Sequence, residues 1–310
     1  MARMTGVGIV IVTLNSGQYV GACLDSALRT GAQVVVVDNG SDDATLEEIR
    51  RRPGARLIAN GFNEGFAAAV NRGVRALDCA WVLLLNPDAI LLGPLDDLVA
   101  ACSRPGVGAA GGRLIDESGA TQAGFLVRRF PTPLALALEV LGVNRVWARN
   151  RVNRRYRCLD LDYDQPAEVE QPAGAFLMVR RDLWEQLGGL DERFFPVWFE
   201  DVDFCKRAAE AGLRIRYEPG AVASHAGGHS VRGASWEARR ISWYSNLLRY
   251  ACKHFSAAGV RAVCAAVVVG SALRVAPEVV VQRSLKPLEV YARILGQAGA
   301  GLLRGRPLSG

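Results

Sequence analysis

Residues 7–14, with the sequence VGIVIVTL, form a continuous run of apolar, mostly β-branched side chains and indicate a buried β-strand. The run ends at Asn15-Ser16-Gly17, which is a turn signal. Similar runs follow at residues 33–37, 56–59 and 81–85, and helical stretches separate them. Strands that alternate with helices at this spacing predict an α/β fold, with a mostly parallel sheet that helices cover on both faces.

Polar clusters follow three of these strands: Asn15, residues 38–43 (DNGSDD) and residues 86–88 (NPD). Ligands of parallel sheets bind outside the carboxyl ends of the strands, so these clusters mark a candidate binding edge. Asp38 fits either a tight turn or a hydrogen bond to a base or ribose. Asp88 fits either a helix cap near Pro94 or a ligand for Mg²⁺, which typically binds one carboxylate plus substrate phosphates.

The pattern changes after about residue 104. Residues 106–112 are glycine-rich, residues 120–129 are typical of an extended segment, and residues 133–157 are helical in part. Six arginines and no acidic residue fall between Arg145 and Arg157. Residues 169–179 predict a turn followed by a buried strand.

The segment 194–225 brings chemistry-bearing residues together. Glu200, Asp201 and Asp203 stand at the start of a predicted helix, and a short strand, residues 213–217, leads toward His225. Acidic residues at a helix start can serve as caps, and the helix dipole favours their charged form. An ionised carboxylate beside a substrate can also take a proton. A single histidine in a loop is either structural or, together with carboxylates, a metal ligand.

Composition excludes several classes of protein. The chain has 310 residues, 50% hydrophobic and 22% charged, which is typical of a globular protein. Its seven cysteines are scattered and form no CxxC pair, which favours a reducing compartment over a disulfide framework or zinc site. We expect no transmembrane helix and no signal peptide. The absence of a GxxxxGK[ST] motif and of GxGxxG after the first strand argues against P-loop and dinucleotide-oxidoreductase chemistry.

The net charge of +6 comes from the end of the chain. From Gly228 onward there are twelve Lys/Arg and three Asp/Glu, whereas the preceding residues carry twenty-five and twenty-eight. Three helical stretches are predicted there, at residues 236–255, 257–276 and 285–303. A basic, apolar tail suits an anionic membrane surface or nucleic acid. Its helices could instead pack on the domain or on a second subunit. The lack of aromatic residues interleaved with basic ones along a groove disfavours nucleic acid.

Six motifs, in order, resemble those of the family 2 glycosyltransferases with the GT-A fold, and most closely the bacterial rhamnosyltransferases of cell-envelope polysaccharide synthesis. The motifs, which span roughly residues 7–230, are IVTLNSGQYVGACLDSAL, VVVVDNGSDD, NEGFAAAVNRG, WVLLLNPDA, QPAGAFLMVRRDLWEQLGGLDERFF and FEDVDFCKRAAEAGLRIRYEPGAVASHAGGHS. The resemblance implies a GT-A-like, Rossmann-like nucleotide-binding sheet with a C-terminal helical extension. It divides the chain into a nucleotide-sugar-binding half (1–104), an acceptor-binding and catalytic half (105–230) and the extension (231–310).

The resemblance also implies roles for individual residues. Asp38 corresponds to the residue that binds the uracil or thymine ring, and Asp88 to a ligand of Mg²⁺ or Mn²⁺ on the diphosphate. His225 helps to hold the metal, Asp201 is the catalytic base and Glu200 assists it. The remaining residues implied to contact the nucleotide sugar are Thr13, Asn15, Asn39, Gly40, Ser41, Asn63, Gly65, Asn71, Asn86 and Gly174. Asn86 occupies the first position of the family's Asp-x-Asp motif, so a single carboxylate remains there.

These roles imply a metal-dependent enzyme that inverts the anomeric carbon. The preferred donor is dTDP-L-rhamnose, and the preferred acceptor is a lipid-linked sugar or polysaccharide at the cytoplasmic face of the plasma membrane. The C-terminal helices then contact the membrane peripherally or form a homodimer, and nucleic acid is not a partner. Two alternatives stay open: the same fold with a UDP-hexose or UDP-galactofuranose donor, and a catalytically inactive protein that binds sugar nucleotides.

Overall fold

The computed structural model describes residues 6–227 and 235–304, so His229 of the last motif lies outside the described residues. The chain forms two compact units. Unit 1 comprises Met1–Arg129, Asp160–Pro196 and Glu200–Gly233; unit 2 comprises Phe130–Leu159, Val197–Phe199 and Ala234–Gly310. Residues 130–159, which sequence reasoning grouped with the catalytic half, therefore make their contacts with the C-terminal helices.

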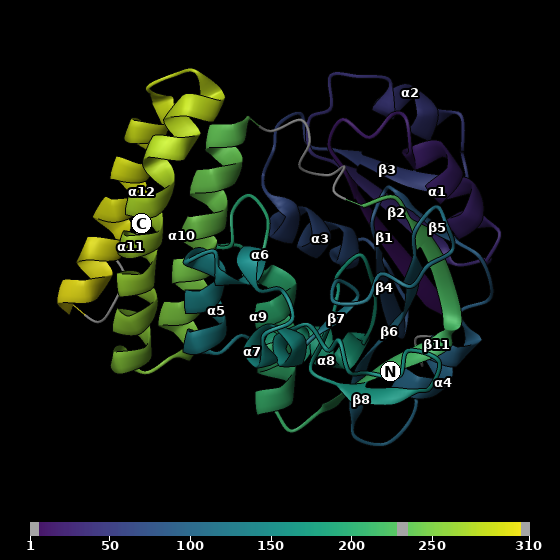
Figure 1. The fold of residues 1–310 in the computed structure, drawn as a ribbon. Coiled ribbons are helices and arrows are strands. Elements are labelled where there is room, and N and C mark those ends of the chain that lie inside the picture. Colours follow the sequence, from purple (N-terminus) through teal and green to yellow (C-terminus); the bar gives the residue numbers. More distant parts are fainter. Residues whose placement is uncertain (1–5, 228–234, 305–310) are drawn as a thin grey trace. The chain divides into compact units, whose positions relative to one another are not determined.

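Unit 1 is built on a nine-stranded sheet with the order β3-β2-β1-β4-β10-β6-β11-β5, in which β8 also pairs with β11, and β7 and β9 form a separate pair (Figure 1). The strands are β1 (Val7–Thr13), β2 (Gln33–Asp38), β3 (Ala55–Ala59), β4 (Trp81–Leu85), β5 (Ala89–Leu91), β6 (Val107–Ile115), β7 (Val127–Arg128), β8 (Ala167–Val169), β9 (Gln171–Pro172), β10 (Phe176–Arg180) and β11 (Arg214–His225).

Helices of unit 1 pack on this sheet. They are α1 (Val20–Leu28), α2 (Thr45–Arg50), α3 (Phe66–Arg75), α4 (Asp96–Cys102), α8 (Arg181–Leu187) and α9 (Glu200–Glu210). α3 contacts β1 and β2, whereas α4 contacts β6, β10 and β11. The four runs predicted as strands form β1 to β4, which pair in parallel in the order β3-β2-β1-β4. The apolar residues of β1, β2 and β4 are buried, whereas β3 is the edge strand and has no buried residue.

The second half of the sheet is mixed, since β10 runs antiparallel to both β4 and β6. The glycine-rich residues 106–112, for which the sequence predicted no element, fall largely within the buried strand β6. A Cβ atom at Gly112 would lie 2.1 Å from Phe176 Cε1, so a side chain there would clash with the neighbouring strand. β11 is longer than the predicted 213–217 and continues through a register shift to His225. Its final residue pairs with Ala89, which brings His225 beside the NPD turn.

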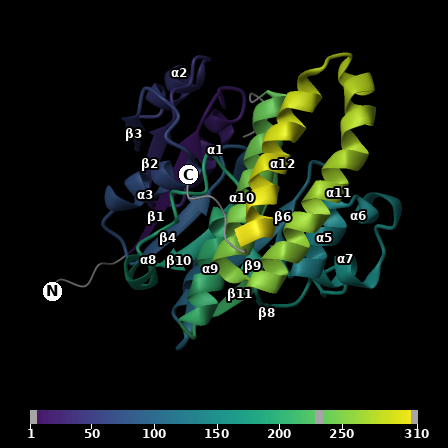
Figure 2. The same cartoon turned by 90° about the vertical axis from the view of Figure 1, so that its left-hand side faces the viewer.

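Unit 2 is helical. Its helices are α5 (Pro133–Val140), α6 (Val143–Val146), α7 (Arg151–Tyr156), α10 (Trp236–His254), α11 (Ala257–Gln282) and α12 (Lys286–Arg304). The side-chain oxygens of Thr132, Ser235 and Ser256 accept backbone N–H groups at the starts of α5, α10 and α11, which explains where these helices begin. α10, α11 and α12 lie side by side, and α5 packs on α11 (Figure 2).

Helix α11 bears on the membrane expectation. Its length and apolar composition would suffice to cross a membrane, and 33% of its most apolar stretch is buried. Core helices of soluble proteins pass the same test. α11 by itself therefore supports neither a membrane span nor its absence.

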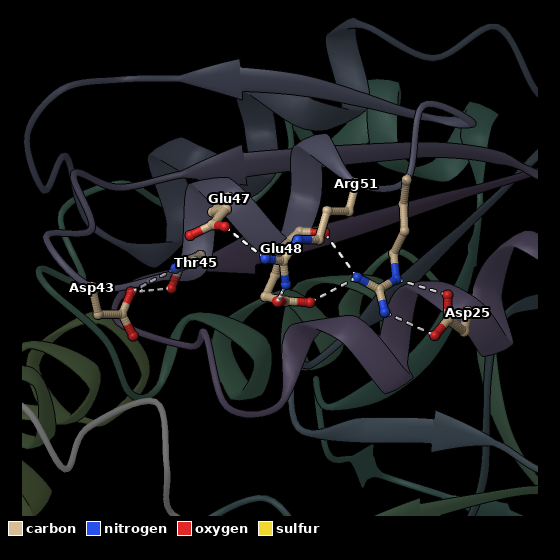
Figure 3. A network of polar contacts seen from close by, with 7 residues as sticks. Asp25, Asp43, Thr45, Glu47, Glu48 and Arg51 are labelled. Carbon is tan, nitrogen blue, oxygen red and sulfur yellow. Dashed lines mark hydrogen bonds and ion pairs between the residues drawn. The ribbon is translucent and has the colours of Figure 1, made fainter.

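A polar network holds α2 against α1 and fixes the loop that precedes α2 (Figure 3). Arg52 forms ion pairs with Asp25 at 2.7 Å and with Glu48 at 2.9 Å. Asp43 accepts hydrogen bonds from the backbone N–H groups of Thr45 at 2.9 Å and Gly17 at 3.0 Å. Exposed ion pairs contribute little stability each, so the network's main effect is to set the position of the loops after β1 and β2.

Candidate functional site

Asp38 ends β2 at the predicted binding edge, and its side chain is buried within its own loop. One carboxylate oxygen accepts the hydroxyls of Thr13 at 2.8 Å and Ser41 at 2.5 Å. The other accepts the backbone N–H groups of Gly40 at 3.1 Å and Ser41 at 2.9 Å. Because these four donors use the lone pairs of the carboxylate, a base would have to displace one of them to bind Asp38 directly. In this conformation, Asp38 organises the loop.

The neighbouring asparagines tie the loops of this edge together. Asn15 has a φ of 51°, and its amide oxygen accepts the N–H of Asp42 at 2.9 Å. The Asn39 side chain donates to Asn63 and to the carbonyl of Gly65, both at 3.3 Å. Gly65 has a φ of 88° and precedes α3, where a non-glycine residue would be strained. These predicted nucleotide contacts therefore form one connected loop surface.

Asn71 has a structural role in the described conformation. It is buried in α3, its amide donates to Leu190 O and Glu192 at 2.9 Å, and its oxygen accepts Leu190 N–H at 2.9 Å. These bonds clamp the 190–192 loop to α3. A nucleotide contact from Asn71 would require this clamp to open.

The structure brings Asn86, Asp88 and His225 together, although 139 residues separate Asn86 from the histidine. His225 Nε2 lies 3.4 Å from Asp88 Oδ1 and 3.4 Å from the Asn86 amide nitrogen. Both Asp88 and His225 side chains are only 1% exposed. Asp88 Oδ2 accepts the backbone N–H of Gly227 at 3.2 Å. The pairing of β11 with β5 creates this cluster.

Gln122 fixes the orientation of His225, and sequence reasoning missed it because nothing in its surroundings distinguishes this glutamine. Its amide N–H₂ donates to the His225 carbonyl at 2.6 Å, so its oxygen must face the ring. That oxygen lies 3.0 Å from Nδ1, which the hydrogen-bond network therefore assigns as protonated. The Nε2 lone pair then faces Asp88. Phe125 stacks on the other side, with ring centroids 5.3 Å apart.

This donor set fits a divalent metal. A carboxylate oxygen of Asp88 and an imidazole nitrogen of His225 converge from buried positions, and the second ring nitrogen is held by a hydrogen bond, as in metal-binding histidines. Within residues 6–227 and 235–304, no group of three His, Cys, Asp or Glu side chains forms a candidate metal cluster. Asp88 and His225 would therefore leave further coordination positions to substrate oxygens or water, as Mg²⁺ commonly requires.

Asp201 stands one residue into α9 and is held by the loop before β10. Its Oδ2 accepts the N–H of Gly174 at 2.9 Å and the Gln171 amide at 3.3 Å. Burial raises the pKa of Asp201, while the N–H groups of Gly174 and Val202 and the charge of Arg128 oppose that rise. Gln171 and Arg128 were not predicted, although Gln171 belongs to the same QPAGAF motif as Gly174.

The Gly174 loop also links Asp201 to the turn that carries the candidate metal ligand Asp88. The backbone N–H of Asn86 donates to the carbonyl of Ala175 at 3.0 Å, next to the Gly174–Asp201 hydrogen bond. A Cβ at Gly174 would lie 3.1 Å from Asp201 Cβ, so glycine permits the close approach. The candidate base and the candidate metal ligands therefore share one rigid connection.

The two other acidic residues of α9 have different environments. Glu200 is buried, its Oε2 accepts no hydrogen bond from the described residues, and burial followed by the charge of Asp201 raises its pKa well above the usual value. Burial therefore favours the neutral form of the Glu200 carboxyl. Asp203 is fully buried and pairs with Arg207 at 2.8 Å, and Arg207 also donates to the carbonyls of Leu187 and Gly189. Asp203 thus stabilises the packing of α9.

Comparison with known proteins agrees with this geometry. The profile of the family described as Glycosyl transferase family 2 matches residues 8–187. The chain belongs to this glycosyltransferase family. An N-acetylglucosaminyl-diphospho-decaprenol L-rhamnosyltransferase of Mycobacterium tuberculosis is 34% identical over 243 residues, which cover 72% of this chain and 76% of the relative. The rhamnosyltransferase WbbL of Escherichia coli is 26% identical over 251 residues, 77% and 89% of the two chains.

Solved glycosyltransferase structures share the fold. TarS of S. aureus in complex with UDP-GlcNAc has a TM-score of 0.58 at 15% identity, covering 96% of this chain and 82% of its own. The mannosyltransferase PcManGT from Pyrobaculum calidifontis, in complex with GDP-Man and Mn²⁺, has a TM-score of 0.54 at 18% identity, covering 98% and 88%. The predicted GT-A-like fold and family 2 membership are confirmed, and the chain is a glycosyltransferase of rhamnosyltransferase type.

Proposed function

We propose that this glycosyltransferase moves L-rhamnose from dTDP-L-rhamnose to a hydroxyl of a lipid-linked or polysaccharide acceptor in cell-envelope synthesis. The observation that carries the proposal is the 34% identity, over most of both chains, with a protein named for rhamnosyl transfer to a diphospho-decaprenol-linked sugar. The buried Asp88–His225 pair and the restrained Asp201 carboxylate supply the chemistry such a transfer needs.

Asp88 and His225 would hold Mg²⁺ or Mn²⁺. When bound, the metal neutralises the charge that develops on the departing nucleoside diphosphate. Gln122 keeps the histidine in the tautomer whose Nε2 lone pair is available. Asn86 contributes no carboxylate, so Asp88 provides the negative charge of the NPD turn.

Asp201 would act as the base. As the acceptor oxygen attacks the anomeric carbon, its proton passes to the Asp201 carboxylate, and the bond from the anomeric carbon to the diphosphate oxygen breaks. One displacement from the face opposite the leaving group inverts the anomeric carbon. Gly174 and Gln171 hold the carboxylate so that its remaining lone pairs can face the acceptor. Glu200 is buried, and its raised pKa favours the neutral carboxyl, so it would support the position of Asp201 and not take the proton itself.

The predicted nucleotide contacts enter the proposal as one surface. Residues 13–15, 38–41 and 63–65 form the connected loops at the ends of β1 and β2 and before α3, where a base and ribose would lie. Residues 1–104 would then bind the nucleotide sugar, and residues 105–230 the acceptor. We place the enzyme in the cytoplasm at the inner membrane surface, with the helices of residues 231–310 contacting lipid or a second subunit.

Calorimetric titration of the purified chain with dTDP, UDP and GDP tests the donor, with Mg²⁺ and again with a chelator. We expect tightest binding of dTDP, and only with metal. Preference for UDP would replace the donor by a UDP-sugar while leaving the family unchanged. If none of the three nucleotides bound, the proposed enzyme activity would be wrong and an inactive binding protein would be the better description.

A further inference from the structure

Unit 2 contains a pocket of about 400 Å³ that the glycosyl-transfer chemistry does not use. It is lined by four arginines, three tryptophans, one tyrosine and one glutamate, all from α5, α6, α10, α11 and the short segment Val197–Phe199. Its volume lies within the usual range for small-molecule sites. Arginine with aromatic side chains is a combination suited to an anionic group attached to an apolar one.

The charge of the lining is positive, because its one acid is already engaged. The Glu139 carboxylate accepts the Asn144 amide at 2.7 Å and lies 3.6 Å from Arg157, which is outside the pocket. Arg274 donates to Tyr244 at 2.9 Å and to backbone carbonyls at the end of α5, none of which carries a full charge. The bonds to the end of α5 explain where the Arg274 guanidinium lies, but they do not neutralise its charge.

Arg240, another arginine of the lining, has a hydrogen-bond donor that the described residues leave without an acceptor. Its guanidinium pairs with Glu278 and lies over the Trp236 ring, 5.5 Å from the centroid. Its Nε atom is buried and has no hydrogen-bond partner among the described residues. Buried donors are rarely left without an acceptor, so this N–H marks a place for a ligand oxygen or a bridging water.

Strained backbone lies in the wall of the same pocket. Trp198 and Phe199 have φ angles of 82° and 73°, which are costly for large non-glycine residues. Phe199 is buried against Tyr250, with ring centroids 5.6 Å apart, and the Val197 carbonyl accepts the Asn246 amide at 2.8 Å. These contacts hold Trp198 in the wall. Trp198 stands three residues before Asp201 in the sequence, so continuous chain joins the pocket to the Glu-Asp motif.

Exposed apolar residues at the end of α6 indicate what kind of anion would bind. Arg145 is an exposed lining residue, and the adjacent Val146 and Trp147 are 93% and 64% exposed. Exposed apolar side chains beside arginines are typical of surfaces that meet lipid. Inorganic phosphate would give these apolar residues nothing to contact.

We propose that this arginine–tryptophan pocket binds the phosphate or diphosphate of an anionic lipid, with the arginines on the phosphate oxygens and the tryptophans along the adjoining hydrocarbon. It is a second anion site, separate from the metal cluster in residues and chemistry. Only the identification of that lipid with the glycosyl acceptor rests on the proposed function; the binding itself does not.

The test is calorimetric titration of the full chain with farnesyl diphosphate, farnesol and inorganic pyrophosphate. EDTA is present throughout, so that no probe binds through metal at Asp88 and His225. We expect farnesyl diphosphate to bind at least about tenfold more tightly than either other probe, because only it offers both the anion and the hydrocarbon. If pyrophosphate bound as tightly as farnesyl diphosphate, the ligand would not be a lipid. If farnesyl diphosphate did not bind, the pocket would not be an anion site for lipids.

Variants locate the binding. Arg145→Gln and Arg239→Gln should each weaken farnesyl diphosphate binding about tenfold or more, and Trp243→Leu should weaken it without improving pyrophosphate binding. Arg151→Gln is the matched control, since it removes an arginine of α7 that does not line the pocket, and it should change affinity less than about twofold. Unchanged affinity in both pocket arginine variants would refute the proposal, and melting curves show whether each variant is folded.

The same titrations keep the two proposals distinguishable. Binding of dTDP with metal but not of farnesyl diphosphate would reject the pocket and leave the glycosyl-transfer proposal standing. Binding of farnesyl diphosphate without any nucleotide binding would do the reverse.

Discussion

Replacement of Gln122 by methionine tests how His225, a candidate metal ligand, is oriented. The substitution keeps the length of the side chain but removes both hydrogen bonds to His225, at 3.0 Å to Nδ1 and 2.6 Å to the carbonyl. It leaves the Phe125 ring stacked on the imidazole. The ring then loses the acceptor that keeps its proton on Nδ1, and either nitrogen can carry it.

The size of the effect follows from these two bonds. A buried donor left without an acceptor costs about 1–3 kcal/mol, so we expect the variant to lose stability of that order. Loss of a hydrogen bond behind a metal-binding histidine typically lowers metal affinity about 10- to 100-fold, or about 1.4–2.8 kcal/mol. The Asp88 carboxylate is unaltered, so binding should weaken and not vanish.

Calorimetric titration with Mn²⁺ in the presence of dTDP measures this affinity directly, without a turnover assay. Gln33→Met is the matched control, because Gln33 also makes two hydrogen bonds to a single residue, Asp78, at 2.8 and 3.2 Å. Gln33 lies at the start of β2, whereas the predicted ligand edge is at the strand's other end. Metal affinity unchanged in Gln122→Met, despite a lower melting temperature, would refute the proposed role of the glutamine.

Four further predictions concern the base and its neighbours. Asp201→Asn should lower kcat by at least about a hundredfold while dTDP still binds, because the base contributes to the chemical step; near-normal turnover would exclude it. A pH profile of kcat should show activity lost, as pH falls, at an apparent pKa above the ordinary aspartate value of about 4. Burial raises the pKa of Asp201, although the charge of Arg128 opposes the rise, and protonation at low pH removes the base form. Glu200→Gln should retain most of the activity, because burial and the charge of Asp201 raise the pKa of Glu200 and favour the neutral form that glutamine resembles; a large loss would show that its ionised form is needed. Gly174→Ala should lower kcat about 10- to 100-fold with little change in melting temperature, because its Cβ would press on Asp201; unaltered kcat would show that the position of the carboxylate tolerates displacement.

The apolar runs of the first ninety residues predicted their strands within a residue or two. β1, β2 and β4 are almost wholly buried, so for these three strands the hydrophobic pattern and the observed structure have the same cause. The same reasoning predicted no strand at β6, because glycines interrupt its apolar run; the close approach of Phe176 is what requires glycine at position 112. It also stopped β11 too early, because a bulged strand can continue past Gly220 once its neighbours supply the hydrogen bonds.

The sequence alone identified the motifs, the family and the candidate site residues Asp38, Asp88, Asp201 and His225, because short motifs carry residue types in a fixed order. It left open whether each carboxylate caps a helix, stabilises a turn or takes part in the reaction. Tertiary structure decided that His225 meets Asp88, since only the pairing of β11 with β5 brings the two together. It also showed that Gln122 contacts His225 and that Gln171 contacts Asp201, because hydrogen bonds between segments far apart in the chain leave no local pattern to find.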